Sequence, residues 1–281
     1  MMRKSLTENG HFCMTWTGNP NYSERTIKSY ICSVGQVARY YNLPPSQITI
    51  DQFKAHLHHL INNKNCSVSR INQDISAWKI LQQDILGRKW EAVKVKRPRR
   101  EKKLPVVLSM SEAKAMINAP VNAKHRILLT LAYATGIRRN ELLKITLKDI
   151  DRKRGVIKIA GKGKKQREVP LSSNLLNLLE EYYRRYRPSV FLFEGHVPGK
   201  AYSAGSVAKI VKRAALKAAI KKNVSPHVLR HSYATHMLEK GVNLKRLQLL
   251  LGHSSMKTTS VYLHLADLDK VELPDLTTDN D

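Results

Sequence analysis

The stretch Leu251–Leu265, LGHSSMKTTSVYLHL, is where the fold and the chemistry of this 281-residue chain can first be worked out. His253 follows a glycine, small hydroxyl residues come next, and Tyr262 stands nine positions after the histidine. The glycine is expected to cap one helix and the serine pair to start the next, about two turns before the tyrosine. A tyrosine in such a helix usually packs in a core. Whether Tyr262 is instead a nucleophile depends on what other segments place around it.

Charge is the strongest feature of the composition. The chain has 49 Lys and Arg against 22 Asp and Glu, a formal net charge of +27. Such an excess favours a polyanionic partner, of which nucleic acid is the commonest. An anionic membrane would need a localised anchor, whereas the basic residues run along the chain to about Lys257. No apolar run approaches the roughly 18 residues of a membrane span, and the N-terminus lacks the apolar core of a signal peptide.

Cysteines and histidines give no sign of a metal site. The three cysteines are scattered and odd in number, which favours reduced thiols in a cytoplasm over a disulfide framework or a zinc site. They are Cys13, Cys32 and Cys66. The histidines of HLHHL have no cysteine or acid beside them, so we expect a partly exposed helix face. They are His56, His58 and His59.

Residues 1–93 are expected to form a small domain of short helices. Residues 21–41 carry an apolar stripe at helical spacing, with Ser23 as a plausible N-cap. Thr49 and Gln52 have the spacing of a capping box and open a second helix. Residues 67–86 supply a third helical segment, either continuous or broken into two. The tryptophans are expected in this domain's core; they are Trp16, Trp78 and Trp90.

A basic linker, residues 94–105, follows this domain. Its sequence KVKRPRREKKLP is nearly all charge and proline and has no periodicity. We expect it to contact DNA through Lys94, Lys96, Arg97, Arg99, Arg100, Lys102 and Lys103. Ser109 and Glu112 then have capping-box spacing, which marks the start of a second domain over residues 106–281.

The second domain is expected to be mainly helical with one small β interruption. Residues 125–136 form an apolar helix that ends at Gly136. Two short apolar runs, 156–159 and 169–171, flank a Gly-Lys-Gly-Lys-Lys turn, which predicts an antiparallel hairpin. The fold class is therefore mainly α, with a small helical N-terminal domain and a larger α-rich domain that contains a small antiparallel hairpin or sheet.

Arginines at helix starts are candidates for anion binding. Backbone N–H groups there favour an anion, and a guanidinium can contact two oxygens of a phosphate at once. Arg138 follows Gly136 at the start of a helix, and Glu141 lies three residues on, where its carboxylate could hold a cation in place. The alternative is an ordinary surface ion pair.

The segment SPHVLRHSY is a second candidate. Ser225 and Pro226 predict a helix start, and His227 and Arg230 then lie on one face of its first turns. A histidine beside an arginine at a helix N-terminus suits phosphate binding and proton transfer. The alternative is a solvated basic face.

The hairpin turn is a third candidate. Its glycines let the backbone approach a ligand closely, and Lys162, Lys164 and Lys165 lie within it. A lysine there could enter a DNA groove. The alternative is an exposed basic turn.

Taken in order, six positions resemble the active-site residues of the tyrosine recombinases, the phage-integrase family: Arg138, Lys162, His227, Arg230, His253 and Tyr262. The surrounding patterns match as well, namely ATGIR..ELL, GKGKK.R.VPL, HVLRHSYATHML..G and LLGHSS...T..Y.H. The gaps resemble those of Xer-type members. The resemblance covers most of the chain, and its second half is the more specific. It implies a SAM-like, core-binding N-terminal domain and a catalytic domain.

One position departs from the family pattern. Arg139 stands where the family usually has an apolar residue, so either arginine of the doublet could meet the phosphate. Glu141, at the expected third position after it, favours Arg138.

The resemblance implies an enzyme that breaks and rejoins DNA strands without ATP. Tyr262 would attack a scissile phosphate, form a 3′-phosphotyrosyl bond and release a 5′-hydroxyl. This ester retains the energy of the phosphodiester, and no carboxylate group is arranged to hold Mg²⁺, so neither a cofactor nor a metal is expected. The implied roles are phosphate binding by Arg138, Arg230 and His253, protonation of the leaving oxygen by Lys162, base catalysis by His227, and support of the site by Glu141.

The implied partner is double-stranded DNA with a specific recombination site. Strand exchange needs four active sites, so the resemblance implies a homo-tetramer on two duplexes, or a tetramer shared with a related recombinase. The acidic, leucine-containing tail, about 265–281, resembles the segment that family members exchange between protomers; the alternative is a frayed end. Chromosome-dimer resolution, phage integration and transposition of a mobile element all use this chemistry. A type IB topoisomerase and a non-catalytic DNA-binding regulator remain as rival functions.

Overall fold

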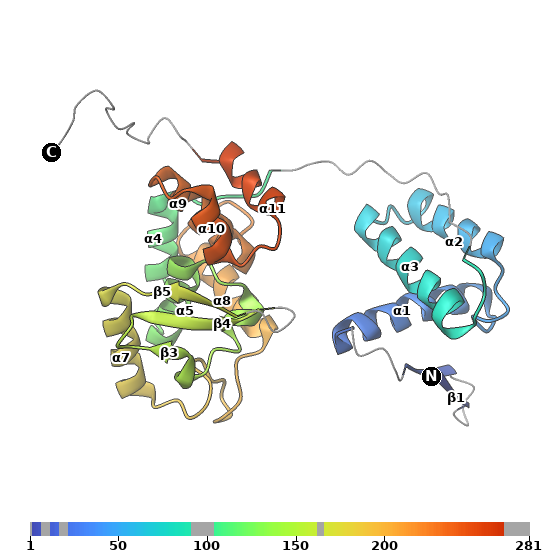
Figure 1. Ribbon diagram of the computed structural model, residues 1–281, viewed down its shortest axis with the longest axis horizontal. Coiled ribbons are helices and arrows are strands. Elements are labelled where there is room, and N and C mark those ends of the chain that lie inside the picture. The colour runs from blue at the N-terminus through green and yellow to red at the C-terminus, as the bar shows by residue number, and fades with distance from the viewer. Residues whose placement is uncertain (1, 7–11, 17–21, 91–103, 162–165, 267–281) are drawn as a thin grey trace. The chain divides into compact units, whose positions relative to one another are not determined.

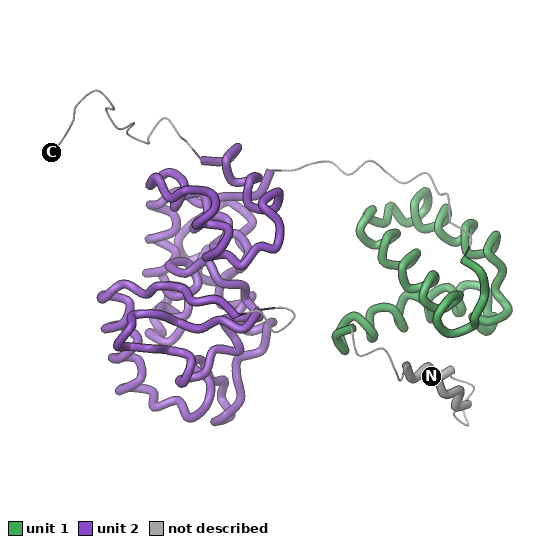
Figure 2. Tube along the Cα trace, in the orientation of Figure 1, with its two compact units in different colours: residues 1–102 green, residues 103–281 purple. Residues whose placement is uncertain are grey.

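The chain divides into two compact units, residues 1–102 and 103–281 (Figure 2). A computed structural model describes residues 2–6, 12–16, 22–90, 104–161 and 166–266, the first two ranges by their backbone alone. The predicted linker therefore lies outside the described residues except for its last two, and its seven basic residues lie outside them as well. The same holds for Lys162, Lys164 and Lys165 and for the tail beyond residue 266.

Helices dominate the N-terminal unit, as the apolar periodicity predicts (Figure 1). The Ser23 side chain accepts a hydrogen bond from the Thr26 amide at the start of the first helix, and Thr49 and Gln52 form the predicted capping box at the start of the second. The third helix continues directly into a π-helical turn, so the third segment is one run with a change of helix type. The bounds are α1 (Glu24–Tyr41), α2 (Ile50–Asn62), α3 (Val68–Ile80) and η1 (Leu81–Ile85).

A short hairpin precedes these helices, and here the sequence-based expectation of helices alone was wrong. Strand β1 (Met2–Leu6) pairs antiparallel with β2 (Phe12–Trp16), with Met2 opposite Trp16. The signal was in the sequence, since the dipeptide Asn9-Gly10 stands between the two runs, and Asn-Gly is a strong hairpin turn signal.

The core of the N-terminal unit is formed by the inner faces of its helices. The Trp78 ring stacks on Phe53 with ring centroids 4.6 Å apart, and Trp90 packs at the edge of the same core. Both tryptophans are thus placed as predicted, whereas the Trp16 side chain lies outside the described residues. Cys32 and Cys66 are free thiols, as expected.

The histidines of α2 do not share one environment. His58 is exposed and His59 partly buried, but His56 is only 4% exposed, so its predicted place on a partly exposed face was wrong. The reason is the helical period, because His56 lies three residues after the buried Phe53 and therefore on the same inward face. Its ring packs against Tyr40 at 4.7 Å between centroids.

The C-terminal unit is a helical body with a three-stranded sheet (Figure 1). The predicted capping box of Ser109 and Glu112 starts its first helix. Its elements, in order, are α4 (Met110–Asn118), α5 (Ala123–Thr135), α6 (Arg139–Leu142), η2 (Leu147–Asp149), β3 (Ile150–Asp151), β4 (Val156–Ala160), β5 (Gln166–Pro170), α7 (Ser173–Tyr186), α8 (Ala204–Lys217), α9 (Pro226–Glu239), α10 (Leu244–Leu251), α11 (Met256–Ser260) and η4 (Val261–His264).

The predicted hairpin is confirmed as strands β4 and β5. They pair antiparallel with Ile157 opposite Val169, and both side chains are buried. The short strand β3 extends the hairpin to an antiparallel sheet of order β3-β4-β5. The strands before and after the glycine- and lysine-containing segment are therefore both anchored in this sheet.

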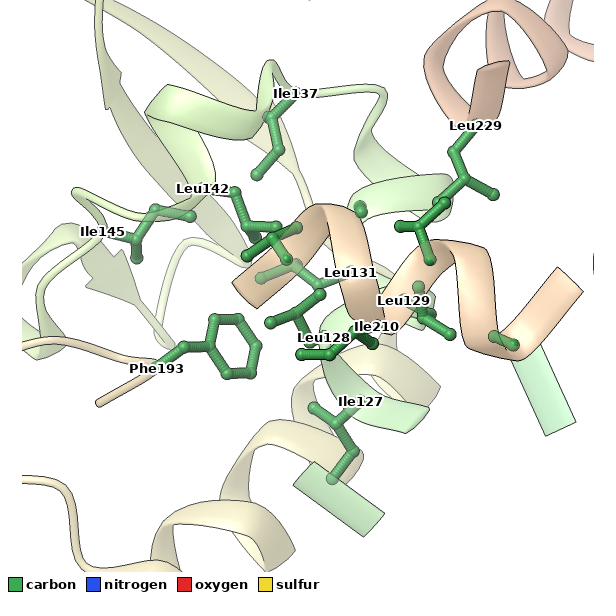
Figure 3. Close-up of a cluster of buried hydrophobic side chains, with 14 of the residues drawn as sticks. Ile127, Leu128, Leu129, Leu131, Ile137, Leu142, Ile145, Phe193, Ile210 and Leu229 are labelled. Atoms are coloured by element: carbon green, nitrogen blue, oxygen red, sulfur yellow. The ribbon is translucent and has the colours of Figure 1, made fainter. Parts of the chain in front are cut away.

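Helix α5 lies within the main core, as Figure 3 shows. Its Leu128 and Leu131 are fully buried beside Ile137 and Leu142, which flank the Arg138 position. Leu229 of α9, the neighbour of Arg230, is buried in the same cluster. Packing of these apolar neighbours thus fixes the backbone on both sides of the candidate arginines.

Gly136 ends α5, and we predict that alanine there is costly. The glycine has φ +57°, a conformation that residues with a Cβ rarely adopt, and an added Cβ would lie 2.2 Å from the Tyr233 ring. Gly136→Ala should therefore lower the unfolding free energy of this unit by about 1–3 kcal/mol, as measured by hydrogen exchange of α5 amides. Gly155→Ala, at a similar φ of +63° but with its nearest neighbour 3.7 Å away, is the control for backbone strain without a clash. An equal cost for the two variants would contradict the steric part of this prediction.

Candidate active site

Arg138 stands immediately before α6, where Glu141 holds its side chain. The Arg138 amide donates to Oε2 of Glu141 at 2.9 Å, and its Nη1 donates to Oε1 at 2.8 Å. Its Nη2 donates to the carbonyl of Gly252 at 3.1 Å. The Arg138 side chain nevertheless remains 38% exposed. The guanidinium is thus fixed in place and still accessible to an anion.

Arg167 of β5 is a second cation on Glu141, and sequence reasoning missed it. Its two terminal nitrogens donate to the two Glu141 oxygens at 3.2 and 2.8 Å, and its Nε donates to the Leu250 carbonyl at 2.8 Å. The hairpin pattern held a signal, because Arg167 pairs with the buried Ile159 and so points inward. An arginine on an inward face needs a buried acceptor.

Glu141 is the anion that organises these two arginines. Its side chain is only 9% exposed. Burial alone raises the pKa of Glu141, but hydrogen bonds from Arg167 and Arg138 outweigh this and lower the pKa to about 2. The carboxylate therefore stays ionised throughout the neutral range and links α6 to the sheet.

Arg230 is buried in the first turns of α9, with 3% of its surface exposed. Its Nη1 donates to the Gly136 carbonyl and its Nη2 to the Leu251 carbonyl, both at 2.7 Å. Burial, with the charge of Arg138, lowers the pKa of Arg230 to about 10, so it remains protonated at neutral pH. A rigid, desolvated cation of this kind can stabilise negative charge that develops beside it.

His253 connects Arg230 to the tyrosine segment. Its Nε2 lies 2.8 Å from Nη2 of Arg230, and its Nδ1 lies 2.9 Å from the hydroxyl of Thr259. An arginine can only donate, so Nε2 is the acceptor and Nδ1 carries the proton that points to Thr259. Burial, followed by the charge of Arg230, lowers the pKa of His253 to about 4.

Tyr262 lies in the 3₁₀ turn η4 rather than inside a helix, because α11 ends at Ser260. The prediction that Tyr262 lies two turns into a single helix was therefore wrong. The residue is 3% exposed, and its ring is parallel to that of His253, with centroids 6.4 Å apart. Burial raises the pKa of Tyr262, while the charge of Arg230 and a hydrogen bond from it act in the opposite direction. The phenolic oxygen therefore faces a guanidinium within an otherwise packed region.

The imidazole that contacts the tyrosine oxygen belongs to His231. Its Nδ1 lies 2.9 Å from the Tyr262 hydroxyl. The sequence analysis expected this contact from His227, which lies one helical turn earlier with its ring centroid 6.4 Å from that of His231. Both histidines share a face of α9, so the helical period alone could not choose between them. Burial, followed by the charge of Arg230, lowers the pKa of His227.

A hollow with a volume of about 280 Å³ opens beside Arg138 and His227. Gly161 at its edge is the last described residue before the turn that carries Lys162. Cationic side chains dominate its polar lining, so it suits an anionic group. The lining residues are Arg138, Arg139, Asn140, Glu141, Lys144, Ala160, Gly161 and His227.

Five of the six sequence-predicted residues thus converge from three parts of the chain. Arg138 and His227 share the hollow, and a continuous set of contacts joins Arg230, His253 and Tyr262. The sixth, Lys162, lies outside the described residues. In the part of the chain that the structure describes, no group of three His, Cys, Asp or Glu residues could hold a metal ion, and no helix is long and apolar enough to cross a membrane.

Two family models match the chain, one for each unit. Residues 17–92 match the N-terminal SAM-like domain of phage integrases, and residues 106–268 match the phage integrase family itself. The chain belongs to the phage integrase family. The family and fold predicted from the sequence motifs are therefore confirmed.

Several recombinases resemble most of the chain. The tyrosine recombinase XerD of Staphylococcus saprophyticus is 36% identical over 78% of this chain and 78% of its own length. A crystal structure of XerA recombinase is 29% identical, with a TM-score of 0.55, and covers 88% of this chain and 89% of XerA. A pre-cleavage complex of XerH recombinase with its difH substrate is 25% identical, with a TM-score of 0.69, and covers 86% of this chain and 76% of XerH.

Proposed function

We propose that this phage integrase family member is a site-specific DNA recombinase that cuts and rejoins duplex DNA through a covalent bond to Tyr262. The observation that carries the proposal is the placement of the Tyr262 oxygen beside His231 and Arg230. In the same unit, Arg138 is held beside a hollow with a cationic lining. XerH, which resembles the chain in sequence and fold, has been captured on its difH DNA before cleavage.

The reaction at phosphorus would use the convergent cations as follows. The phenolic oxygen of Tyr262 attacks the scissile phosphate, the 3′-phosphotyrosyl bond forms, and the bond to the 5′ oxygen breaks. Arg138 and Arg230 neutralise the non-bridging oxygens, on which charge accumulates. Lys162, which follows Gly161 of the hollow in the sequence, would give a proton to the 5′ oxygen. His227 would contribute a hydrogen bond to the phosphate, His253 keeps Arg230 oriented through its Nε2, and Glu141 keeps Arg138 oriented.

DNA would be held by both halves of the chain. Residues 1–93 would bind the core of the recombination site, residues 106–281 would hold the scissile phosphate, and the basic segment 94–105 would cross the DNA backbone between them. Strand exchange requires four such sites, so the active form is a tetramer on two duplexes, in which the segment from about 265 to 281 docks on a neighbouring protomer. Because its proposed substrate is DNA with a recombination site, the protein would act in the cytoplasm.

A nicked suicide substrate tests the proposal. With a nick just beyond the scissile phosphate, the released 5′-hydroxyl fragment diffuses away and the covalent complex accumulates. The expected result is a protein–DNA band that survives SDS, whose protease fragment carries DNA on Tyr262 in mass spectrometry. The DNA comes from sites recovered by genome-wide mapping of bound fragments. Relaxation of supercoiled DNA by monomers, without strand exchange between paired sites, would instead support a type IB topoisomerase. DNA binding without any covalent band would support a non-catalytic DNA-binding regulator.

A further inference from the structure

Among the histidines that the structure describes, His231 is the one whose imidazole contacts the atom proposed to attack phosphorus. Its Nδ1 lies 2.9 Å from the Tyr262 oxygen, within hydrogen-bond range for proton transfer. His253 is occupied, because its Nε2 accepts from Arg230 and its Nδ1 donates to Thr259. Of the three histidines around the candidate site, only His231 therefore has a nitrogen directed at the tyrosine hydroxyl.

The direction of these hydrogen bonds favours proton transfer from the tyrosine to His231. Arg230 acts on the pKa of the same phenol by its charge and by hydrogen bonding, and a guanidinium can only donate. The phenol's own proton is therefore available for the other neighbour, Nδ1 of His231. In this arrangement Nε2 of His231 carries the ring proton and Nδ1 presents its lone pair.

The surroundings keep His231 neutral and therefore able to accept a proton. Among the described residues, the charged and titratable groups that act on it are His227 and Arg230 on its own helix, Tyr262 on η4, and His253 after α10. Burial, followed by the charges of His227 and Arg230, lowers the pKa of His231 to about 4. At neutral pH the ring is uncharged, and the phenolate that forms beside Arg230 is stabilised by the guanidinium.

We propose that His231 is a catalytic residue of this enzyme, the general base that takes the tyrosine proton through Nδ1. This inference rests on the proposed function. In cleavage, the Tyr262 O–H bond breaks, its proton moves to Nδ1, and its electron pair forms the oxygen–phosphorus bond. The phosphorus–5′-oxygen bond breaks at the same time, and the 5′ oxygen takes the proton that the proposed function assigns to Lys162. In religation the 5′-hydroxyl returns that proton to Lys162 as it attacks phosphorus, the phosphotyrosyl bond breaks, and the imidazolium of His231 returns its proton to the phenolic oxygen.

The first test compares His231→Asn with the full-length wild-type chain. The asparagine amide can preserve a hydrogen bond near the Nδ1 position but cannot carry the proton away. On saturating suicide DNA, the single-turnover rate of covalent complex formation should fall about 10²–10⁴-fold, as expected for loss of a general base. His196→Asn changes an exposed histidine of the same unit and is the matched control, with a rate within about twofold of wild type.

The second test separates base catalysis from a structural role. Fluorotyrosine at position 262 lowers the pKa of the phenol, so it should raise the cleavage rate of His231→Asn at least tenfold. It should not raise the cleavage rate of Arg138→Ala. A 5′-bridging sulfur in the substrate, whose thiolate leaves without a proton, should not rescue His231→Asn. If sulfur rescues the variant and fluorine does not, His231 acts on the leaving group and the proposal is overturned.

A third pair of variants covers the case in which His231→Asn does not fold. Nδ1-methylhistidine at position 231 keeps the ring and blocks the proposed acceptor atom, whereas Nε2-methylhistidine leaves that atom free. We expect cleavage to be lost with the first and retained with the second. Equal rates for the two would overturn the assignment.

The same assay distinguishes failure of the proposed function from failure of this inference. If the wild-type chain forms no Tyr262-dependent covalent complex, the proposed function fails. If the wild-type chain forms it and His231→Asn forms it at the same rate, only this inference fails.

Discussion

Tyr262→Phe is expected to abolish covalent attachment to DNA and to leave DNA binding within about threefold of wild type. The substitution removes one oxygen, which is the only atom proposed to bond to phosphorus. The phenyl ring keeps the apolar contacts of the buried residue with its neighbours in the α9–α10 cluster. Phosphate contacts by lysines and arginines dominate the affinity of such a protein for DNA, and they are unchanged. The measurement is the SDS-resistant band on a suicide substrate, together with a binding titration at fixed salt.

The matched control for this prediction is Tyr183→Phe. Tyr183 lies on α7, is 41% exposed, and is not part of the candidate site. It should form the covalent complex at the wild-type rate. A covalent band of normal intensity from Tyr262→Phe would show that another tyrosine is the nucleophile and would contradict the assignment.

Glu141→Ala is expected to destabilise the C-terminal unit by about 3–5 kcal/mol, the usual cost of removing one partner from a buried ion pair. The loss leaves Arg167, whose side chain is 12% exposed, without its carboxylate, and it removes the two hydrogen bonds between Arg138 and Glu141. Cleavage should also fall steeply because Arg138 is no longer fixed. Hydrogen exchange of β5 and α9 amides in the full chain measures the stability of this unit directly.

Glu168→Ala is the control for Glu141→Ala on the same strand system. Glu168 pairs with Arg154 by two hydrogen bonds, but both side chains are exposed, at 41% and 58%. An exposed pair contributes about 1 kcal/mol or less. Equal losses in the two variants would mean that the burial of Glu141 has no energetic consequence.

The pH dependence of stability gives a second measure of how much the Glu141 carboxylate stabilises the C-terminal unit. Its pKa is lowered in the folded protein, so its contribution to stability is complete above its ordinary pKa near 4.5 and is lost as the pH falls toward about 2. The difference corresponds to roughly 3 kcal/mol. Glu141→Gln should lack this component, so the stability difference between wild type and variant should shrink as the pH falls from 5 to 2. A difference that stays constant over this range would contradict the assigned pKa.

Much of the fold could be predicted from local patterns. Helix starts at Ser23, Thr49 and Ser109 follow capping rules that involve neighbours three residues apart. The β4–β5 hairpin follows from alternating apolar residues around a glycine-containing turn. The two wrong predictions for the N-terminal unit also concern local patterns. The Asn9-Gly10 dipeptide indicates the first hairpin, and the helical period places His56 on the buried face of α2.

The candidate site was predictable only in part. Residue types and their order indicated Arg138, Arg230, His253 and Tyr262, and the structure brings their segments together. Arg167 was missed because its partner Glu141 is 26 residues away in the sequence. The bond exists only because the Arg167 side chain of β5 extends to Glu141 of α6 and to the Leu250 carbonyl of α10, and no local spacing encodes that approach.

By itself the sequence determined the helical character of the chain, its preference for a polyanionic partner, its family and the approximate set of reactive residues. These properties depend on composition and on spacings within one element. The tertiary structure alone decided which histidine meets the tyrosine. His227 and His231 are one turn apart on the same face of α9, so their spacing makes them equivalent. Packing of η4 against α9 places the Tyr262 oxygen 2.9 Å from His231, and a contact between elements 31 residues apart is set by that packing and not by helical period.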